Sequence, residues 1–308
     1  MLKVNKHKKV FSILTIALAM IIYISVNHSF ININVQAASL TKLEKGKIKQ
    51  EKLIKILKQQ KEEKLDKLEN QIKVYLGSNI NNIGLSYYDI NSGRKMIING
   101  SNTFLAGSTI KVQMNMVLAD LFKNGQASVN EKLQYTPDCY ETGTGILQGT
   151  DFAELQNPLP IMLLSKYSII HSDNIATNMI IKSIGYEKLR DDIDIKLGHV
   201  TNHSGNYITA NDETKLLKIL YENPTKNPYY PIIIKNMKNT DFHDRIDLYI
   251  PRDIVAHKIG DYDSYVNDVG IIYTKQPFIL SVYTNEVVNA NQVIAHVSKM
   301  IYDYQNTL

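Results

Sequence analysis

The amino-acid sequence predicts a single α+β unit whose sheet is completed by the C-terminal part of the chain. Strand-like runs lie within residues 83–98 and again within 254–284, and helical segments fill most of the sequence between them. Strands at both ends with helices in the middle favour one sheet with helices packed against it. The chain has 308 residues, of which 44% are hydrophobic, so it is long enough to bury a sizeable core.

Residues 1–37 have the pattern of a signal peptide or a membrane anchor. Four lysines precede an apolar run of 17 residues from Val10 to Val26, and the triplet Val35-Gln36-Ala37 is typical of a signal-peptidase site. The length of the apolar run is borderline for a membrane span, so a cleaved leader and an uncleaved anchor both stay open. We therefore expect an exported protein, secreted or held at the cell surface, that meets the membrane only through this segment.

Residues 38–69 are expected to form a charged helical spacer. Lys, Glu, Gln and Leu dominate this stretch, which contains no proline, and its leucines fall near helical spacing. A polar gap at 59–63 interrupts the apolar stripe, which argues against a long coiled coil. We expect the last turns, Leu65 to Leu76, to pack on the domain formed by residues 70–308.

The net charge of +5 is unevenly distributed along the chain. Residues 77–308 contain 20 basic and 24 acidic side chains, so the bulk of the protein is mildly acidic. A nucleic-acid partner is therefore not expected.

The single cysteine, Cys139, excludes an intramolecular disulfide. We expect a monomer.

The strands are placed by apolar and β-branched runs bounded by turn residues. Residues 83–90 and 95–98 flank Asn91-Ser92-Gly93 and predict a β-hairpin. Three further runs, at 254–259, 266–274 and 278–284, predict the rest of the sheet. Residues 289–303 then have the apolar spacing of an amphipathic closing helix.

A serine and a lysine three residues apart open the first predicted helix of the middle region. The pattern Ser-x-x-Lys occurs at Ser39, Ser92 and Ser108, but only Ser108 precedes apolar residues at helical spacing. Ser108 is therefore predicted at the helix N-cap, where Lys111 shares its face and can reach its hydroxyl. An ordinary helix cap beside a surface lysine is the alternative interpretation of this motif alone.

Two further motifs follow in the sequence. Ser172-Asp173-Asn174 lies between predicted helices at 159–170 and 175–184, and Asp173 is expected to brace the loop. Lys258-Ile259-Gly260 ends a β-branched run, so a strand there would aim Lys258 across a cleft toward Ser172.

The three motifs, separated by 64 and 86 residues, together resemble those of the penicillin-recognising serine hydrolases, most closely the class A β-lactamases. The segment 140–148 resembles the loop before the middle motif of that family, and the resemblance covers residues 70–308. It implies a β-lactamase/transpeptidase-like fold, with an antiparallel sheet flanked by helices and a helical subdomain. It also implies a site with no metal and no cofactor. The implied catalytic residues are Ser108, Lys111, Ser172 and Lys258, and the implied substrate-binding residues are Asn174, Gly260, Asp261 and Ser264.

The resemblance also assigns a role to each group. Ser108 would attack an amide carbonyl while neutral Lys111 takes its proton, with burial and the charge of Lys258 lowering the Lys111 pKa. The backbone N–H groups of Ser108 and Asp261 would hold the oxyanion. Ser172 would pass a proton to the leaving nitrogen.

Two features depart from the family pattern. Class A enzymes use a glutamate in an omega-shaped loop for deacylation, but here only His203, Ser204, Gly205 and Asn206 lie between the loop's two ends. Deacylation would then be slow or would use another base such as His203. Ile259 also replaces a hydroxyl residue, for which Ser264 or Tyr262 could substitute.

Three functions therefore stay open from the sequence. The protein could hydrolyse a small-molecule β-lactam, or act as a peptidase or transpeptidase on the D-Ala-D-Ala stem peptides of peptidoglycan. It could also be a sensor that is acylated once without turnover. The short loop disfavours efficient β-lactam turnover.

Overall fold

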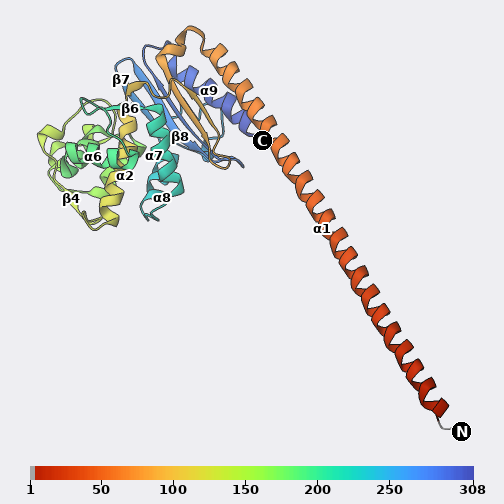
Figure 1. Cartoon of the computed structure of the whole chain (residues 1–308). Helices are drawn as coiled ribbons and strands as arrows, with labels where there is room; N and C mark the ends of the chain where they lie inside the picture. The colour runs from red at the N-terminus through yellow and green to blue at the C-terminus, as the bar shows by residue number, and fades with distance from the viewer. Residues whose placement is uncertain (1–3) are drawn as a thin grey trace. The chain divides into compact units, whose positions relative to one another are not determined.

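The computed structural model describes residues 4–308 (Figure 1). Residues 1–3, which include the first lysine of the expected leader, lie outside the described residues. The chain divides into two compact units at the boundary between Lys64 and Leu65. The larger unit, from Leu65 to Leu308, contains all three motifs.

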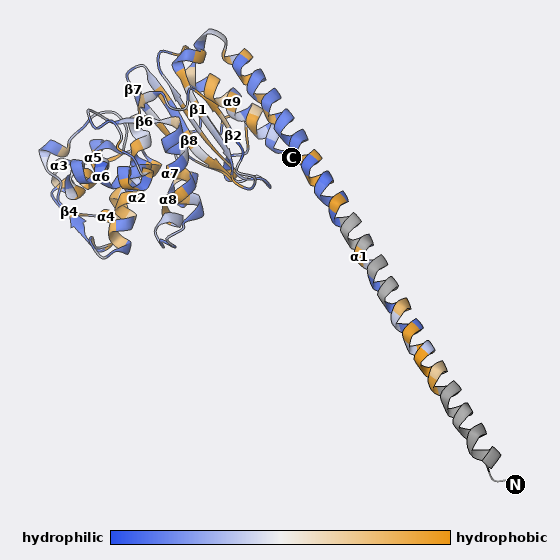
Figure 2. Ribbon diagram, in the orientation of Figure 1, coloured by the Kyte–Doolittle hydropathy of each residue, from blue (hydrophilic) through white to orange (hydrophobic). Residues whose placement is uncertain are grey.

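The smaller unit is helical throughout its described residues. It forms the first part of α1 (Val4–Leu76), so the apolar run and the charged spacer belong to one continuous helix. Large apolar side chains between Leu18 and Ile31 are exposed on it (Figure 2). Between residues 4 and 308, no helix combines the length and the apolar character that a membrane crossing needs.

The larger unit is built on a five-stranded antiparallel sheet with strand order β2-β1-β9-β8-β7. The strands are β1 (Ile83–Asp89), β2 (Lys95–Ile98), β7 (Val255–Tyr262), β8 (Tyr265–Ile272) and β9 (Phe278–Thr284). The predicted N-terminal hairpin and the three C-terminal strands are thus confirmed, and β9 joins them by pairing with β1. β7 lies at an edge and continues past the predicted end, so that it includes Gly260 and Asp261.

Helices cover both faces of this sheet. On one face pack α9 (Ala290–Gln305) and the last turns of α1, where Leu65, Leu68, Ile72 and Leu76 are buried as predicted. In Figure 2 α9 carries both apolar and polar residues, as expected for a helix with one buried side. On the other face lie α7 (Ala210–Glu222) and α8 (Tyr230–Lys238).

A helical subdomain lies beside this second face (Figure 1). It consists of α2 (Ile110–Lys123), α3 (Phe152–Leu155), α4 (Ile161–Ile170), α5 (Asn174–Ile184) and α6 (Tyr186–Leu197). Short strand pairs accompany it: β3 (Thr103–Leu105) with β6 (Tyr207–Thr209), and β4 (Lys132–Leu133) with β5 (Leu159–Pro160). Every residue of α2 from Ile110 to Ala119 is buried, so its polar side chains need internal partners.

One such partner is a fully buried carboxyl group beneath the first motif. Glu213 is 0% exposed and accepts a hydrogen bond of 2.7 Å from Gln113 Nε2. The Tyr283 hydroxyl donates to the same carboxyl oxygen at 3.4 Å and lies 3.0 Å from Thr109 Oγ1. These contacts connect α7 and β9 to the residue that follows Ser108. Because burial disfavours the ionised form, the pKa of Glu213 is raised to about 7.

The raised pKa of Glu213 predicts a pH-dependent stability. Between pH 4.5 and 7 the folded protein keeps a proton that the unfolded chain releases, so the free energy of unfolding falls as pH rises through this window. Glu213→Gln removes the ionisation, and we expect it to stabilise the protein at pH 8 by on the order of 2 kcal/mol relative to its effect at pH 5. Denaturant unfolding at the two pH values measures this difference. An equal effect of the substitution at both values would contradict it.

Candidate active site

The three motifs line one cavity of about 700 Å³ between the sheet edge and the helical subdomain. Of the predicted residues, Ser108, Lys111, Ser172, Asn174 and Asp261 line it. Lys258 and Gly260 lie immediately behind these, in contact with them, as the distances below show. The predicted convergence of residues from Ser108 to Asp261 is therefore found in the structure.

Ser108 lies in a 3₁₀ turn, Gly107–Thr109, that precedes α2. The prediction that Ser108 caps the helix was wrong, because this extra turn moves the start of α2 to Ile110 and no side chain caps it. Ser108 is half-buried, and its hydroxyl makes no hydrogen bond with any described residue. The hydroxyl is thus available to a molecule in the cavity.

Lys111 is buried on the first turn of α2 and points toward the second motif. Its Nζ donates to Ser172 O at 2.7 Å, to Ser172 Oγ at 3.2 Å and to Asn174 Oδ1 at 2.7 Å. No hydrogen bond joins it to Ser108, which differs from the expected pairing. Burial lowers the pKa of Lys111 to about 7, against the opposing charges of Glu141 and Asp173. Lys111 is therefore poised to exchange a proton near neutral pH.

Lys258 reaches the same serine from β7, as predicted. It is 0% exposed, and its Nζ donates to Ser172 Oγ at 3.0 Å and to Ile259 O at 2.9 Å. Burial holds the pKa of Lys258 well below its ordinary value, and the charge of Lys111 lowers it further. The expected repulsion between the two ammonium groups thus acts on Lys258, whereas Lys111 is affected mainly by its own burial.

Ser172 adopts an unusual backbone conformation for a residue other than glycine, with φ at 51°. The conformation is fixed from both sides, because Thr144 Oγ1 donates to Ser172 O at 2.7 Å and Asn174 N donates to Thr144 O at 3.1 Å. Such strain is typical of functional sites, where the surrounding structure imposes it. Here it turns the Ser172 hydroxyl toward both lysines.

Asp173 braces the loop, which confirms the prediction. Its carboxylate accepts hydrogen bonds from the backbone N–H groups of Ile146, at 2.7 Å, and Leu147, at 2.8 Å, and caps α5 through Ala176 N. Gly145 packs directly on this carboxylate, where an added Cβ would lie 2.5 Å from Asp173 Cγ. The segment 140–148 is thus held against the second motif.

Gly260 allows β7 to lie directly on the turn that carries Ser108. A Cβ at this position would lie 2.3 Å from Ala106 O and 2.8 Å from Thr109 N. In the same way, a Cβ on Gly107 would lie 2.7 Å from the backbone N of Asp261. The backbone of Asp261 therefore lies beside Ser108, where the sequence placed its N–H as an oxyanion donor.

Two predicted side chains near the end of β7 have other partners. Arg245 makes a bidentate ion pair with the Asp261 carboxylate, at 2.6 and 2.8 Å. Ser264 lies in the turn after β7, where its hydroxyl donates to Asn285 Oδ1 at 2.7 Å, and it does not line the cavity. Tyr262, the other residue considered as a replacement for the missing hydroxyl, does line it.

The segment 198–209 supplies cavity residues but no carboxylate. Residues 204–207 line the cavity, and Asn206 Nδ2 donates to Gly107 O at 2.9 Å. His203 does not line it, because Nε2 is paired with Asp194 Oδ2 at 2.8 Å, so the structure does not support His203 as the alternative base. Asp212 and Glu213 lie in the following helix, as predicted.

Sequence reasoning missed Glu141, a carboxylate that does line the cavity. It accepts a hydrogen bond of 2.8 Å from Asn178 Nδ2, and its charge acts on Lys111. Its place within the segment 140–148, which the family resemblance includes, was the available signal.

The site as a whole combines an unpaired hydroxyl, two buried amines and a second hydroxyl between them. This arrangement suits nucleophilic attack by Ser108 with proton transfer through Lys111 and Ser172.

The chain resembles known proteins in sequence and in fold. A sequence model of the β-lactamase enzyme family matches residues 64–305. The chain is 25% identical over 271 residues to the β-lactamase VEB-1 of Pseudomonas aeruginosa. The aligned region covers 78% of this chain and 90% of that protein.

Solved structures give the same fold. PBP-A superposes with a TM-score of 0.71 at 23% identity, covering 79% of this chain and 97% of that one. The TLA-1 extended-spectrum β-lactamase superposes with a TM-score of 0.69 at 23% identity, covering 78% and 98%. A PBP-A variant in an acyl-enzyme complex with penicillin G gives 0.72 at 22% identity, covering 79% and 98%. These likenesses confirm the expected β-lactamase/transpeptidase-like fold.

The close packing at Gly260 predicts that even one added methyl group disturbs the site. Because the Cβ of Gly260→Ala would meet backbone atoms, we expect the substitution to lower the free energy of unfolding by about 1–3 kcal/mol. Gly149→Ala is the matched control, since a Cβ there has no atom within 4 Å. Denaturant unfolding of both variants tests this, and equal stabilities would contradict the packing described here.

Proposed function

Because this chain belongs to the β-lactamase enzyme family and is a serine hydrolase of the class A type, we propose that it forms an acyl-enzyme on Ser108 with β-lactams and releases the product slowly. The observation that supports this most strongly is the convergence of Lys111 and Lys258 on the Ser172 hydroxyl. That contact links the three motifs into a path along which a proton can move.

In the proposed acylation, Ser108 Oγ attacks the carbonyl carbon of the lactam and Lys111, in its neutral form, takes the hydroxyl proton. The carbonyl oxygen becomes an oxyanion beside the N–H groups of Ser108 and Asp261, and one such donor is typically worth ~10²–10³ in rate. When the intermediate collapses, the C–N bond breaks and the nitrogen takes a proton from Ser172, which regains one from Lys111. Asn174 is positioned to bind the substrate amide.

Lys258 serves this path by holding the Ser172 hydroxyl and by providing positive potential at the substrate's carboxylate. The Phe242 ring, 5.6 Å from its Nζ, adds a favourable surface for the charged form. Ile259 lines the cavity where the family usually has a hydroxyl, so the substrate's carboxylate depends more heavily on Lys258 here.

We infer slow release of the acyl product from the carboxylates that line the cavity. Of the cavity-lining residues that the structure describes, only Glu141 and Asp261 carry a carboxylate. Asp261 is paired with Arg245, and Glu141 accepts a hydrogen bond from Asn178. A water molecule approaching the ester thus lacks the loop glutamate that activates it in class A enzymes.

The same observation supports a second candidate, a peptidase or transpeptidase acting on D-Ala-D-Ala stem peptides. An acyl-enzyme that water attacks slowly is available to an amine acceptor instead. The two candidates differ in whether an added amine, such as a D-amino acid, shortens the lifetime of the acyl-enzyme.

We also propose that the protein is exported. The lysines before the apolar run and the triplet Val35-Gln36-Ala37 support a leader or an anchor. A helical spacer before the domain would then hold the site away from the membrane.

The nucleophile assignment is tested by the intact mass of the full chain mixed with benzylpenicillin. Because a β-lactam acylates without losing a leaving group, we expect a mass increase of one whole ligand molecule. Ser108→Ala should abolish the adduct. Ser92→Ala is the matched control, since Ser92 also begins a Ser-x-x-Lys pattern, and it should leave the adduct unchanged. An adduct that survives in Ser108→Ala would rule out Ser108.

The lifetime of that adduct tests whether the absence of the loop glutamate slows deacylation. A positioned general base contributes typically about 10²–10⁴-fold to a step, so without one we expect release of the acyl group to be much slower than acylation. Intact mass followed after removal of free ligand measures the release rate. Clearance as fast as acylation would mean that another residue activates water efficiently.

A further inference from the structure

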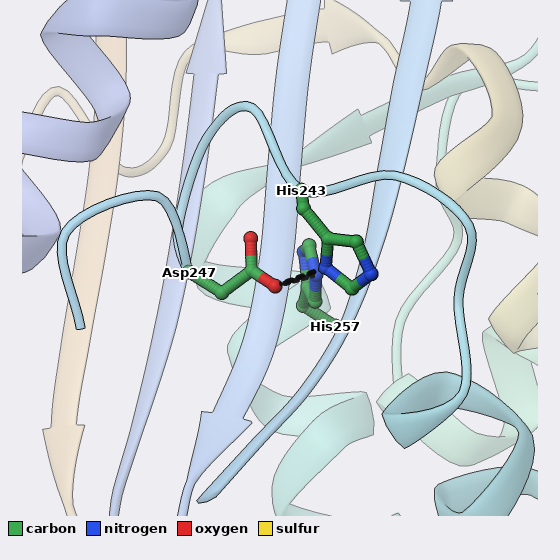
Figure 3. Close-up of side chains that lie close together, drawn as sticks. All are labelled: His243, Asp247 and His257. Carbon is green, nitrogen blue, oxygen red and sulfur yellow. Dashed lines mark hydrogen bonds and ion pairs between the residues drawn. The ribbon is translucent and has the colours of Figure 1, made fainter. Parts of the chain in front are cut away.

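Three titratable side chains gather on the face of β7 away from the cavity. His257 immediately precedes Lys258 in the strand, and neighbouring residues of a strand point to opposite faces. His243 and Asp247 come from the segment between α8 and β7 and face it (Figure 3). One nitrogen or oxygen atom from each of the three lies within 4.8 Å of the others.

The bonds that hold His257 leave one of its nitrogens without a hydrogen bond. Its Nδ1 lies 3.0 and 2.9 Å from the two oxygens of Asp268, which is itself fixed by Ile246 N at 2.9 Å. Its Nε2 lies 3.4 Å from Asp247 Oδ2, an ion-pair contact that does not have the geometry of a hydrogen bond. Within residues 4–308, neither this Nε2 nor Asp247 Oδ1 has a hydrogen-bond partner, although both side chains are 1% exposed.

This arrangement is the one that metal-binding histidines show in proteins. A ligating imidazole usually donates its second N–H to a carboxylate, which fixes the ring and raises its basicity. Asp268 occupies that position here. Buried polar atoms without partners are rare and call for a group that satisfies them.

The charges at the cluster also favour a cation. Asp247 and Asp268 place two carboxylates in a buried site. A divalent cation would neutralise both carboxylates, and on binding it would displace the proton from His257 Nε2 into solvent.

We propose that His243, Asp247 and His257 bind a divalent transition-metal ion of the zinc class, with Asp268 orienting His257. Two imidazole nitrogens and a carboxylate oxygen suit zinc and its first-row neighbours, whereas magnesium and calcium prefer oxygen ligands alone. Water or Asp247 Oδ1 would complete the coordination.

One of the three ligand atoms would have to move for a zinc ion to fit between them. Two ligands at about 2.0–2.2 Å from zinc in a tetrahedral site lie about 3.4 Å apart. The separation of His257 Nε2 and Asp247 Oδ2 is already 3.4 Å. His243 Nδ1 lies only 2.5 Å from Asp247 Oδ2, so its ring would move outward by about 1 Å to admit the ion. Its side chain is 30% exposed, which leaves it room to do so.

Such an ion would join the segment 243–247 to the strand that carries Lys258. This inference is independent of the function proposed above, and it revises the expectation of a protein without a metal. No sequence pattern indicated this site, because the fold, and not ligand-like spacing, brings His257 to His243 and Asp247.

Zinc binding by the full chain, purified without a polyhistidine tag, tests the proposal. After chelator treatment, reloading with Zn²⁺ and dialysis, we expect elemental analysis to find one Zn²⁺ per chain, and the reloaded protein to melt at a higher temperature than the chelator-treated protein. Cobalt(II) at the site should give the intense visible absorption of a four-coordinate ion. Magnesium and calcium at the same concentration should not displace either ion.

Two histidine variants separate this site from adventitious binding. His243→Ala should weaken Zn²⁺ binding at least about tenfold and remove the cobalt spectrum. His203→Ala is the matched control, because His203 is 27% exposed and is paired with a single aspartate, Asp194, at 2.8 Å. It should bind Zn²⁺ as the unchanged protein does. No bound zinc in the unchanged protein, or equal affinity in His243→Ala, would overturn the proposal.

Discussion

The site depends on one constraint, which is that two lysine side chains are buried against the same serine hydroxyl. Lys111 and Lys258 both donate to Ser172 Oγ, at 3.2 and 3.0 Å. Burial lowers the pKa values of both lysines, and the charge of Lys111 lowers that of Lys258 further, so that Lys111 can be neutral near pH 7. The strained backbone of Ser172, its bracing by Thr144 and the buried α2 all serve to hold this contact.

The edge strand β7 connects this contact to the rest of the fold. Gly260 lets β7 rest on the turn Gly107–Thr109, which sets the distance between the strand and the nucleophile. Because side chains alternate along a strand, β7 presents Lys258 to the cavity and His257 to the opposite face. The buried carboxylates on that opposite face thus lie next to the catalytic strand, and the Arg245–Asp261 pair fixes the strand's end.

Much of this could be predicted from the sequence, and the failures have physical causes. Alternation and turn residues located the strands, and the three motifs located the site, because both signals are local. The start of α2 was misplaced because the residues before it form a separate 3₁₀ turn, packed against Gly260, which the apolar spacing of the helix does not reveal. Glu141, the Arg245–Asp261 pair and the histidine cluster all depend on contacts between distant segments. Ser264 misses the cavity because the turn after β7 gives its hydroxyl to Asn285.

The central claim is that Lys111 is an amine that can lose its proton near neutral pH. The most direct test is an NMR titration of the lysine ε-carbons in the uniformly labelled protein, with the Lys111 signal assigned by its absence in Lys111→Arg. The account predicts that this signal titrates near pH 7, far below an ordinary lysine. A Lys111 signal that stays in its charged form to about pH 10 would contradict the account, because no neutral amine would then be present to take the Ser108 proton.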